Sequence, residues 1–230
     1  PGKGRVGGGR VGYLGRDLLD LSENEMTAIR WRHIAMVFQG AMNALNPVRT
    51  VGDQIAEAIR RHLPRVSSLE MDGMVRRLLD TVGINPARRN NYPHQYSGGM
   101  RQRAVIAMAL ACTPTILIAD EPTTALDVMI QAQILRLLMD LKAKLGLALI
   151  LVTHDLGVVA EMCDRVAVMY AGEIVEHTDV MTLFRDPLHP YTRALLAAVP
   201  EPDPASARAA EPIDVLPGRA GAAAADRGCV

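Results

Sequence analysis

Two apolar runs, each followed directly by polar residues, constrain the fold of this chain more than any other feature of its sequence. Residues 116–119 precede an Asp-Glu pair, and residues 147–152 precede a Thr-His pair. An uninterrupted apolar run of this length predicts a strand that is buried on both faces of a sheet. The stretch between the runs, residues 127–145, predicts a long helix that is closed by Gly146. A strand, a helix and a second strand in this order predict an α/β fold with a parallel sheet.

The segment before these strands contains three stretches with helical periodicity. They cover residues 50–61, 69–82 and 97–112, and Ser97 is placed to cap the last of them. Upstream of them, Ile34–Phe38 is a short apolar run of strand length. Three helices in succession predict a helical lobe inserted into the sheet domain.

Shorter signals predict the elements on either side. Ser22 and Glu25 have the spacing of a capping box at the start of a helix. Residues 165–170 and 173–177 flank an Ala-Gly pair and predict a β-hairpin. From Pro200 onward Pro, Ala and Gly dominate, which predicts a poorly packed tail.

Charge and cysteine content narrow the classes of function. Lys+Arg and Asp+Glu both number 25, so the net charge is zero and gives no electrostatic basis for binding nucleic acid. The 3 cysteines are too few and too scattered for a disulfide framework or a zinc site, which suits a reducing cytosol. The apolar runs, such as Ala148–Val152, are too short to span a bilayer.

Asp120 and Glu121 stand where the first buried strand is expected to end. In open parallel sheets, ligands gather at the carboxyl ends of the strands. The Asp120 carboxylate can hold Mg²⁺ directly or through water, because this ion prefers hard oxygen ligands. Glu121 can polarise an attacking water as a general base. The alternative is a pair of acids that caps a turn before Pro122; the Pro-Thr-Thr-Ala-Leu-Asp run that follows favours the functional interpretation.

Two further polar residues follow expected strands. His154 comes after the second buried strand, and Gln39 comes after the run that ends at Phe38. A histidine in such a place can donate a hydrogen bond to a terminal phosphate. The amide oxygen of Gln39 can contact Mg²⁺ or the attacking water. A lone histidine is more often structural, but the place of His154 after the second buried strand favours the functional interpretation. An exposed glutamine alone carries no information, so the assignment of Gln39 depends on the other motifs.

Ser97, Gly98 and Gly99 open the third predicted helix. The free N–H groups of a helix N-terminus attract anions, and glycines let a phosphate approach the backbone closely. A Ser-Gly-Gly cap alone is weak evidence, but here Met-Arg-Gln-Arg and a helix of small residues follow it. Arg101 and Arg103 in this run are expected to be solvated or paired, and not to read nucleic-acid bases.

These motifs, in this order, resemble the nucleotide-binding subunit of ABC transporters over nearly the whole chain. The matched motifs are the Q-loop (Gln39), the signature (Ser97–Gln102), the Walker B strand with the catalytic glutamate (Asp120 and Glu121), the D-loop (Thr124–Asp127) and the switch histidine (His154). The resemblance implies ATP and Mg²⁺ as ligands and Glu121 and His154 as catalytic residues. It implies that Asp120 and Gln39 contact the metal, and that the nucleotide is contacted by Gln39, Ser97, Gly98, Gly99, Met100, Gln102 and Asp127.

The same resemblance implies a fold and a division of the chain. The fold is a partial RecA-like P-loop NTPase core with a parallel sheet and an inserted helical subdomain. Residues 1–41 and 114–183 are expected to form the core, and residues 42–113 the helical subdomain with the signature. Residues 184–230 are expected to form a C-terminal extension of the oligopeptide-transporter type, partly disordered.

Two further runs resemble the oligopeptide, dipeptide and nickel importer branch of the family. They are Asn43–Pro47, which follows Phe38 and Gln39, and Asp186–Thr192. In this branch two ATPase subunits sandwich two ATP molecules, and the signature of each serves the ATP held by its partner. The implied partners are a second ABC ATPase subunit, transmembrane permease subunits and, indirectly, a solute-binding protein, with no nucleic acid. The implied location is peripheral, on the cytoplasmic face of the cell membrane.

The chain departs from the family pattern in three places. No stretch reads G-x-x-x-x-G-K-[ST], the phosphate loop, which is expected upstream of Pro1 together with the aromatic residue that stacks on adenine. Gly40 and Ala41 replace the usual acidic residue and proline, and Cys229 stands alone where a cysteine-rich tail is common. These departures predict a fragment that is inactive by itself and that leaves apolar sheet surface exposed.

Three functions follow from the sequence. The first is the ATP-hydrolysing subunit of a peptide or nickel importer. The second is a degenerate partner that lends its signature to another subunit but hydrolyses nothing, although the intact Glu121 and His154 argue against long decay. The third is a soluble ABC ATPase of DNA repair or translation, which the neutral charge and the Asp186–Thr192 run disfavour.

Overall fold

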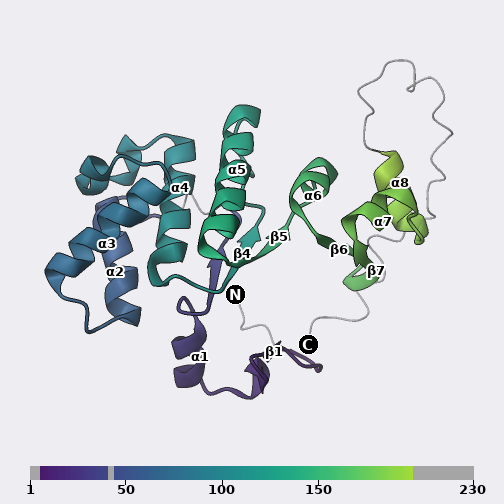
Figure 1. Ribbon diagram of the computed structural model, residues 1–230, viewed down its shortest axis with the longest axis horizontal. Coiled ribbons are helices and arrows are strands. Elements are labelled where there is room, and N and C mark those ends of the chain that lie inside the picture. The colour runs from purple at the N-terminus through teal and green to yellow at the C-terminus, as the bar shows by residue number, and fades with distance from the viewer. Residues whose placement is uncertain (1–5, 41–43, 199–230) are drawn as a thin grey trace. The chain divides into compact units, whose positions relative to one another are not determined.

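The computed structural model describes residues 6–40 and 44–198, which fall into two units (Figure 1). Tyr13–His154 forms one unit, here called the sheet unit. The described parts of Pro1–Gly12 and Asp155–Val230 form the other, here called the hairpin unit. The tail predicted from Pro200 onward lies outside the described residues, and so does the 41–43 segment after the Q-loop.

Within the described residues, a parallel sheet of three strands organises the sheet unit. The strands are β3 (Ile34–Val37), β4 (Ile116–Asp120) and β5 (Ala148–Val152), in the order β3-β4-β5. The long helix α5 (Val128–Leu145) connects β4 to β5 and ends at Gly146 in the left-handed conformation. The buried side chains of these elements include Val37, Leu117, Ala119, Ile134, Leu138 and Leu141. The predicted α/β fold with a parallel sheet is thus confirmed.

The prediction that residues 147–152 form a strand buried on both faces is wrong. Ile150 and Val152 in β5 are 51% and 48% exposed. Strand pairing places Ile150 beside Ile118 on the same face of the sheet, whereas Leu117 on the opposite face is fully buried. In the described part of this sheet β5 is the last strand, so one of its edges has no neighbouring strand there. An apolar run predicts a strand, but burial of both faces also depends on what packs against it.

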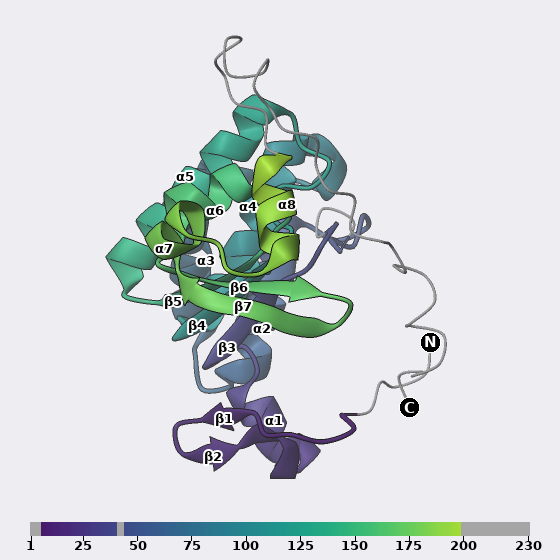
Figure 2. The same ribbon diagram turned by 90° about the vertical axis from the view of Figure 1, so that its right-hand side faces the viewer.

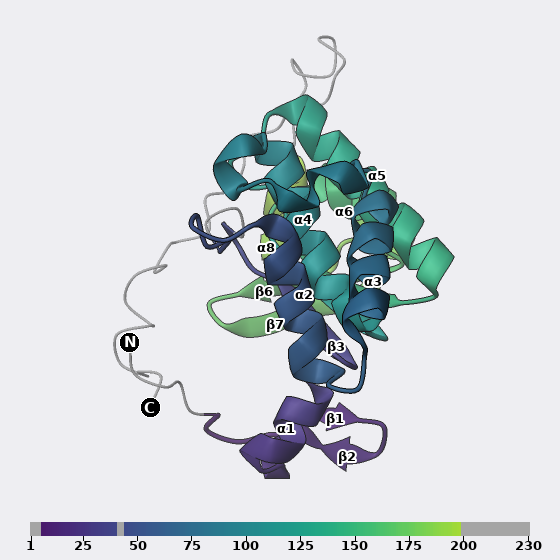
Figure 3. The same ribbon diagram turned by 90° about the vertical axis from the view of Figure 1, so that its left-hand side faces the viewer.

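Three helices form the lobe that was predicted between β3 and β4, as Figure 3 shows. They are α2 (Val51–His62), α3 (Ser68–Thr81) and α4 (Gly98–Ala109), and they pack against one another. Each begins after a hydroxyl side chain that accepts a backbone N–H, and the three caps are Thr50, Ser67 and Ser97. Two short 3₁₀ helices, Pro86–Asn90 and Pro93–Gln95, lie between α3 and α4, and a third, Leu110–Cys112, directly follows α4.

A small hairpin followed by a helix precedes β3, and from Tyr13 onward this segment belongs to the sheet unit. Strands β1 (Gly12–Tyr13) and β2 (Arg16–Asp17) lead through a 3₁₀ helix (Leu18–Asp20) to α1 (Glu23–Ile29). The predicted capping box is confirmed, because Ser22 and Glu25 exchange hydrogen bonds at the start of α1. The hydrogen bonds from Ser22, with a further one from Arg16, lower the pKa of Glu25 to about 2.

The hairpin unit is built around two antiparallel strands (Figure 2). Strands β6 (Arg165–Tyr170) and β7 (Glu173–Asp179) confirm the predicted hairpin, and Ala171 and Gly172 at its turn both have positive φ. Three short helices complete the described part: α6 (Leu156–Met162), α7 (Val180–Arg185) and α8 (Pro190–Ala197). Among the described helices of both units, none combines the length and the apolar character needed to cross a membrane.

Candidate active site

Glu121 lies at the centre of a polar cluster at the carboxyl ends of the parallel strands. It follows the last residue of β4, and its N–H donates to the carbonyl oxygen of Val152 at the end of β5 over 2.9 Å. Its φ of 43° is in the left-handed region, which a residue with a side chain seldom adopts. Such strained backbone costs free energy and persists only where the surroundings hold it, often at functional sites.

Three side chains of the sheet unit form hydrogen bonds with the Glu121 carboxylate. The amide of Gln39 donates from Nε2 to Oε2 over 2.6 Å, and the Thr124 hydroxyl donates to the same oxygen over 2.8 Å. Nδ1 of His154 lies 3.2 Å from Oε1 and donates in the tautomer that carries its proton on Nδ1. The sequence placed Gln39, Glu121 and His154 after three different strands, and the structure brings them together.

The hydrogen bonds favour the ionised form of this carboxyl. The Thr124 hydroxyl contributes most, followed by His154, and Gln39 adds a smaller effect; together they hold the pKa of Glu121 below its ordinary value despite some desolvation. Glu121 is therefore a carboxylate at neutral pH and can accept a proton. The His154 side chain is 82% exposed, so solvent or a ligand can reach it.

Asp120 has the position and the free oxygens expected of a metal ligand. It ends β4 directly before Glu121 and is partly buried. Within the described residues, its carboxylate has no hydrogen bond or ion pair. No group of three or more His, Cys, Asp and Glu side chains in that same part of the chain is arranged to hold a metal ion. The site therefore fits a cation that takes most of its ligands from water and phosphate, as Mg²⁺ does, and not an ion in an all-protein cage.

The signature residues occupy the first turn of α4. Ser97 is the N-cap, and its hydroxyl accepts the N–H of Met100 over 3.3 Å. The N–H groups of this first turn are the kind of donors that bind an anion at a helix N-terminus. Gln102 is only 3% exposed, so in this structure its side chain lies in the interior and not at an open surface. Its predicted contact with nucleotide stays a prediction.

Asp127 caps α5 and does not lie in the Glu121 cluster. Its Oδ1 accepts the N–H of Ile130 over 3.0 Å. The loop that joins Glu121 to Asp127 is tightly turned, with the Thr124 N–H bonded to the Glu121 carbonyl and Ala125 at a φ of 64°. The predicted role of Asp127 at the nucleotide also stays a prediction.

Thr124 is a member of the cluster that the sequence analysis did not single out as a site residue. It was placed in the D-loop by resemblance, with no part in holding the carboxylate. The available signal was a hydroxyl residue three positions after the glutamate, a spacing at which a turn brings the two side chains together. The left-handed φ of Glu121, which helps to create that turn, was not visible in the sequence.

A comparison with models of protein families shows which family this chain belongs to. The family model described as ABC transporter matches residues 3–124, more than half of the chain. The chain belongs to the ABC transporter family. A second model, the oligopeptide/dipeptide transporter C-terminal region, matches residues 175–230. The predicted family is confirmed, and the second match supports its predicted peptide-transport branch.

Relatives of this ABC chain carry names from peptide transport. It is 61% identical over 196 residues to "Probable peptide ABC transporter ATP-binding protein y4tR" of Sinorhizobium fredii, covering 84% of this chain and 58% of that protein. It is 53% identical over 205 residues to "Dipeptide transport ATP-binding protein DppD" of Bacillus subtilis, covering 88% of this chain and 61% of that protein. The chain thus spans about three fifths of the length of these relatives.

Solved ABC cassettes share the fold. The chain superimposes with a TM-score of 0.66 on the "Dimeric structure of a post-hydrolysis state of the ATP-binding cassette MJ0796 bound to ADP and Pi". The two chains are 31% identical, and the match covers 76% of this chain and 74% of the other. The likeness confirms the predicted fold class, an ATPase cassette with a parallel sheet and several helices.

Proposed function

We propose that this chain acts as an ATP-binding and ATP-hydrolysing subunit of an ABC importer for peptides. The observation that carries the proposal is the Glu121 cluster, in which Gln39 and His154 from two other strand ends meet one ionised carboxylate. A general base must be deprotonated and within reach of a water molecule. The lowered pKa of Glu121 meets the first requirement, and the solvent exposure of His154 beside it supports the second.

Each residue of the cluster has a distinct part in this proposal. Glu121 accepts a proton from the attacking water, and Gln39 orients that water once its amide releases the carboxylate. His154 donates a hydrogen bond to the terminal phosphate and holds it in line with the water. Thr124 holds the carboxylate of Glu121 in position through the 2.8 Å hydrogen bond.

The metal of the proposed reaction is Mg²⁺, with Asp120 and the amide oxygen of Gln39 as its protein ligands. When bound, this ion neutralises charge on the phosphate oxygens of ATP. The two oxygen-bearing side chains sit at the ends of neighbouring parallel strands, β4 and β3, which supports a shared ligand at that edge.

The partners follow from the kinds of protein that this chain resembles. The similar solved cassettes are described as dimers, and the relatives are named for peptide transport. We therefore include a second ATPase subunit, whose bound ATP receives the signature Ser97–Gln102, and a membrane permease on whose cytoplasmic side the dimer lies. The match to the oligopeptide transporter C-terminal region supports this function over an ABC ATPase of DNA repair or translation.

The substitution Glu121→Gln tests the proposal in the assembled transporter. It keeps the shape of the side chain and the acceptor oxygen but removes the charge. We expect ATP binding to persist and turnover to fall by at least about a hundredfold, because general-base catalysis is worth that much. Glu173→Gln, an exposed change on β7, serves as the control and should leave both unchanged.

Two results would contradict the proposal. Undiminished turnover in Glu121→Gln would remove Glu121 from the catalytic role. ATP binding without turnover in the unmodified protein, paired with an active partner, would instead identify a non-hydrolysing subunit that only lends its signature.

A further inference from the structure

The first turn of α4 and the first turn of α5 approach each other more closely than any side chain on Gly99 would permit. A Cβ built on Gly99 would lie 2.7 Å from Cγ2 and 3.5 Å from Cδ1 of Ile130. Gly99 is buried, and it is absent from the glycines with positive φ. Its backbone conformation is therefore open to any residue, and the close approach of Ile130 is a reason for a glycine here. A glycine within a helix is less favourable than alanine, so its presence at this position calls for a structural reason.

Ile130 is itself held in a defined place. Its N–H donates to Oδ1 of Asp127 over 3.0 Å, which fixes the start of α5. The next residue, Gln131, donates from Nε2 to the carbonyl oxygen of Leu126 over 3.0 Å and so ties the helix to the preceding loop. Isoleucine is branched at Cβ and has one strongly preferred χ1 rotamer in a helix. The Ile130 side chain that contacts Gly99 therefore has little rotational freedom, and its helix is held to the preceding loop, residues 121–127.

The same loop continues to the catalytic carboxylate. The Leu126 N–H donates to the Thr123 carbonyl, and the Thr124 N–H donates to the Glu121 carbonyl, each over 3.2 Å. The Thr124 hydroxyl completes the path with its bond to Oε2 of Glu121. Ala125 and Glu121 both have left-handed φ values, so the loop has little freedom to shift in one part only. Contacts thus run without a break from Glu121 to the first turn of α4.

We infer that Ile130 is a positioning residue that couples the loop of residues 121–127 to the first turn of α4, Ser97–Met100, through its contact with Gly99. The inference rests on the proposed function, in which Glu121 serves the ATP of its own subunit and the signature serves the ATP of the partner. A shift of Glu121 is then passed to Ser97–Met100, and through it to the second ATP site. The contact between Ile130 and Gly99 is the mechanical link between the two sites within one chain.

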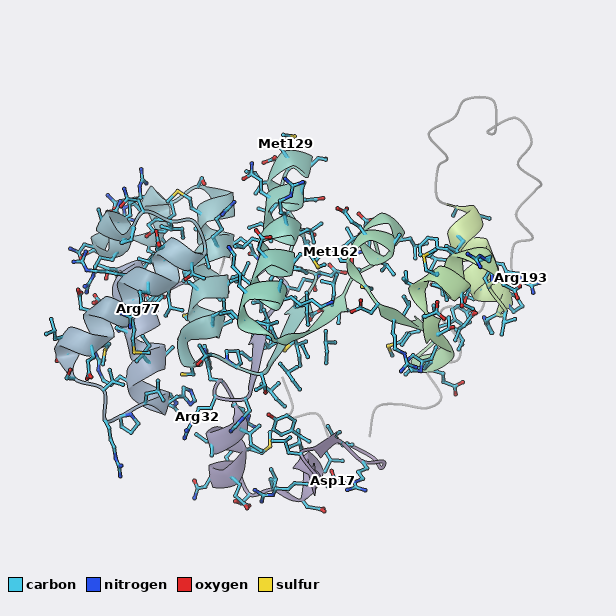
Figure 4. The ribbon with its side chains drawn as sticks, viewed as in Figure 1. Asp17, Arg32, Arg77, Met129, Met162 and Arg193 are labelled. Atoms are coloured by element: carbon cyan, nitrogen blue, oxygen red, sulfur yellow. The ribbon has the colours of Figure 1, made fainter. Side chains whose placement is uncertain are left out.

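Three variants and one control separate this coupling from local packing. Gly99→Ala introduces the methyl group that clashes with Ile130. Ile130→Ala removes the contact, and the double variant Gly99→Ala/Ile130→Ala removes the clash while keeping the new methyl. Met129→Ala is the control, because Met129 is the neighbouring residue in the same turn but is 72% exposed (Figure 4).

Amide hydrogen exchange of the full chain without nucleotide is the first measurement, since it does not depend on ATP turnover. Two pairs of amides report on the two ends of the link: Met100 and Arg101 in the α4 turn, and Thr124 and Leu126 in the loop. We expect Gly99→Ala and Ile130→Ala to accelerate exchange by at least about fivefold in both pairs, and Met129→Ala to change neither. A change confined to the α4 pair would overturn the coupling and leave only local packing.

ATP turnover in the assembled transporter is the second measurement. We expect Gly99→Ala to lower kcat by about tenfold to a hundredfold with KM little changed, which is the cost of a small misplacement. The double variant should recover most of that loss, and failure to recover would mean that Gly99 is needed for close approach of phosphate and not for Ile130. If the unmodified protein has no turnover, the proposed function fails, while the exchange experiment still supports or overturns the coupling.

Discussion

Arg103 in α4 donates a hydrogen bond from Nη1 to the carbonyl oxygen of Val82 over 2.8 Å. Val82 is the C-cap of α3, so its carbonyl is one of the acceptors that a helix end leaves without an internal partner. Nη2 of the same guanidinium reaches Oε1 of Gln133 in α5 over 3.3 Å. One side chain thus links three helices, and the expectation that Arg103 is paired is confirmed.

Removing this guanidinium should destabilise the helical lobe. Val82 is fully buried, and Arg103→Ala would leave its carbonyl without the charged donor. We expect the free energy of unfolding to fall by about 1.5–3 kcal/mol, the range for a hydrogen bond to a charged group. Urea denaturation followed by circular dichroism measures this. Arg77→Ala, at an exposed position on α3 (Figure 4), is the control and should stay within about 0.5 kcal/mol. Equal losses in the two variants would contradict the structural role of Arg103.

The secondary structure of this chain was predictable where the signal is local. The periodic stretches became α2, α3 and α4, and the helix expected at 127–145 became α5. N-caps and turn residues fix such elements through contacts of a few positions along the chain, which a sequence shows directly. The burial of β5 was not predictable in this way, because the exposure of Ile150 depends on which distant segments cover that face of the sheet.

The sequence predicted some residues of the candidate site but not the contacts that hold them. The sequence indicated that Gln39, Glu121 and His154 follow strands, and parallel strands bring their carboxyl ends to one edge. It did not show the left-handed φ of Glu121, the Thr124 hydrogen bond or the approach of Ile130 to Gly99. The Thr124 hydrogen bond had a local signal, the spacing of three positions from Glu121, but it also needs the left-handed φ of Glu121, which the sequence does not show. The approach of Ile130 to Gly99 depends on packing between residues about 30 positions apart, for which a single sequence carries no local signal.

Replacing each of two glycines in the helical lobe by alanine should change the free energy of unfolding in opposite directions. A Cβ on Gly52 in α2 would lie 2.8 Å from the carbonyl oxygen of Arg89, which is backbone and cannot easily move. We expect Gly52→Ala to destabilise the protein by about 1–3 kcal/mol, the usual cost of overpacking. A Cβ on Gly73 in α3 would meet only the tip of the Arg77 side chain, at 3.3 Å. Gly73→Ala should therefore stabilise by about 0.5–1 kcal/mol through reduced backbone entropy of the unfolded chain.

Thermal unfolding of the two glycine variants under one buffer condition measures both shifts. Each substitution adds the same methyl group to an α-helix, so each controls for the other. Shifts of the same sign would mean that the Arg89 carbonyl does not set the cost at Gly52.

Trp31 provides an optical probe of the ionisation of His62. It is the only tryptophan in the sequence, its Nε1 donates to the Met108 carbonyl over 2.7 Å, and its ring lies 5.6 Å from that of His62. Burial lowers the pKa of His62 below its ordinary value of 6.5, and the charges of Arg61 and Arg32 lower it further. Protonated imidazole quenches indole emission, so we expect Trp31 fluorescence to fall with a midpoint below pH 6.5.

The lowered pKa of His62 also makes the free energy of unfolding depend on pH. The unfolded chain binds a proton at His62 more readily than the folded chain does, so stability is full above about pH 6.5 and declines as the pH falls. His62→Gln should remove the fluorescence transition, and His94→Gln, at an exposed histidine, should leave it in place. A transition that survives in His62→Gln would assign the quenching to another group.

The start of α8 in the hairpin unit should be sensitive to acid. The Glu176 carboxylate accepts the N–H of Leu188 over 2.9 Å and that of His189 over 3.1 Å, just before the helix begins. Burial acts to raise the pKa of Glu176, but these hydrogen bonds and the charge of His189 outweigh it, and the pKa is lowered. The contribution of Glu176 is therefore complete above the ordinary glutamate pKa of about 4.3 and is lost as the pH falls through the lower value of the folded state.

Amide exchange of α8 over a pH series tests this dependence. We expect the protection of α8 to decline below about pH 4.3 in the unmodified protein, after correction for the intrinsic exchange rate. Glu176→Gln carries no charge and retains one acceptor oxygen, so its α8 should show the weaker protection already at pH 7, without the acid transition. Glu173→Gln, on the same strand but exposed, should behave as the unmodified protein. Equal protection of α8 at pH 7 in Glu176→Gln and Glu173→Gln would show that the helix does not depend on the Glu176 charge.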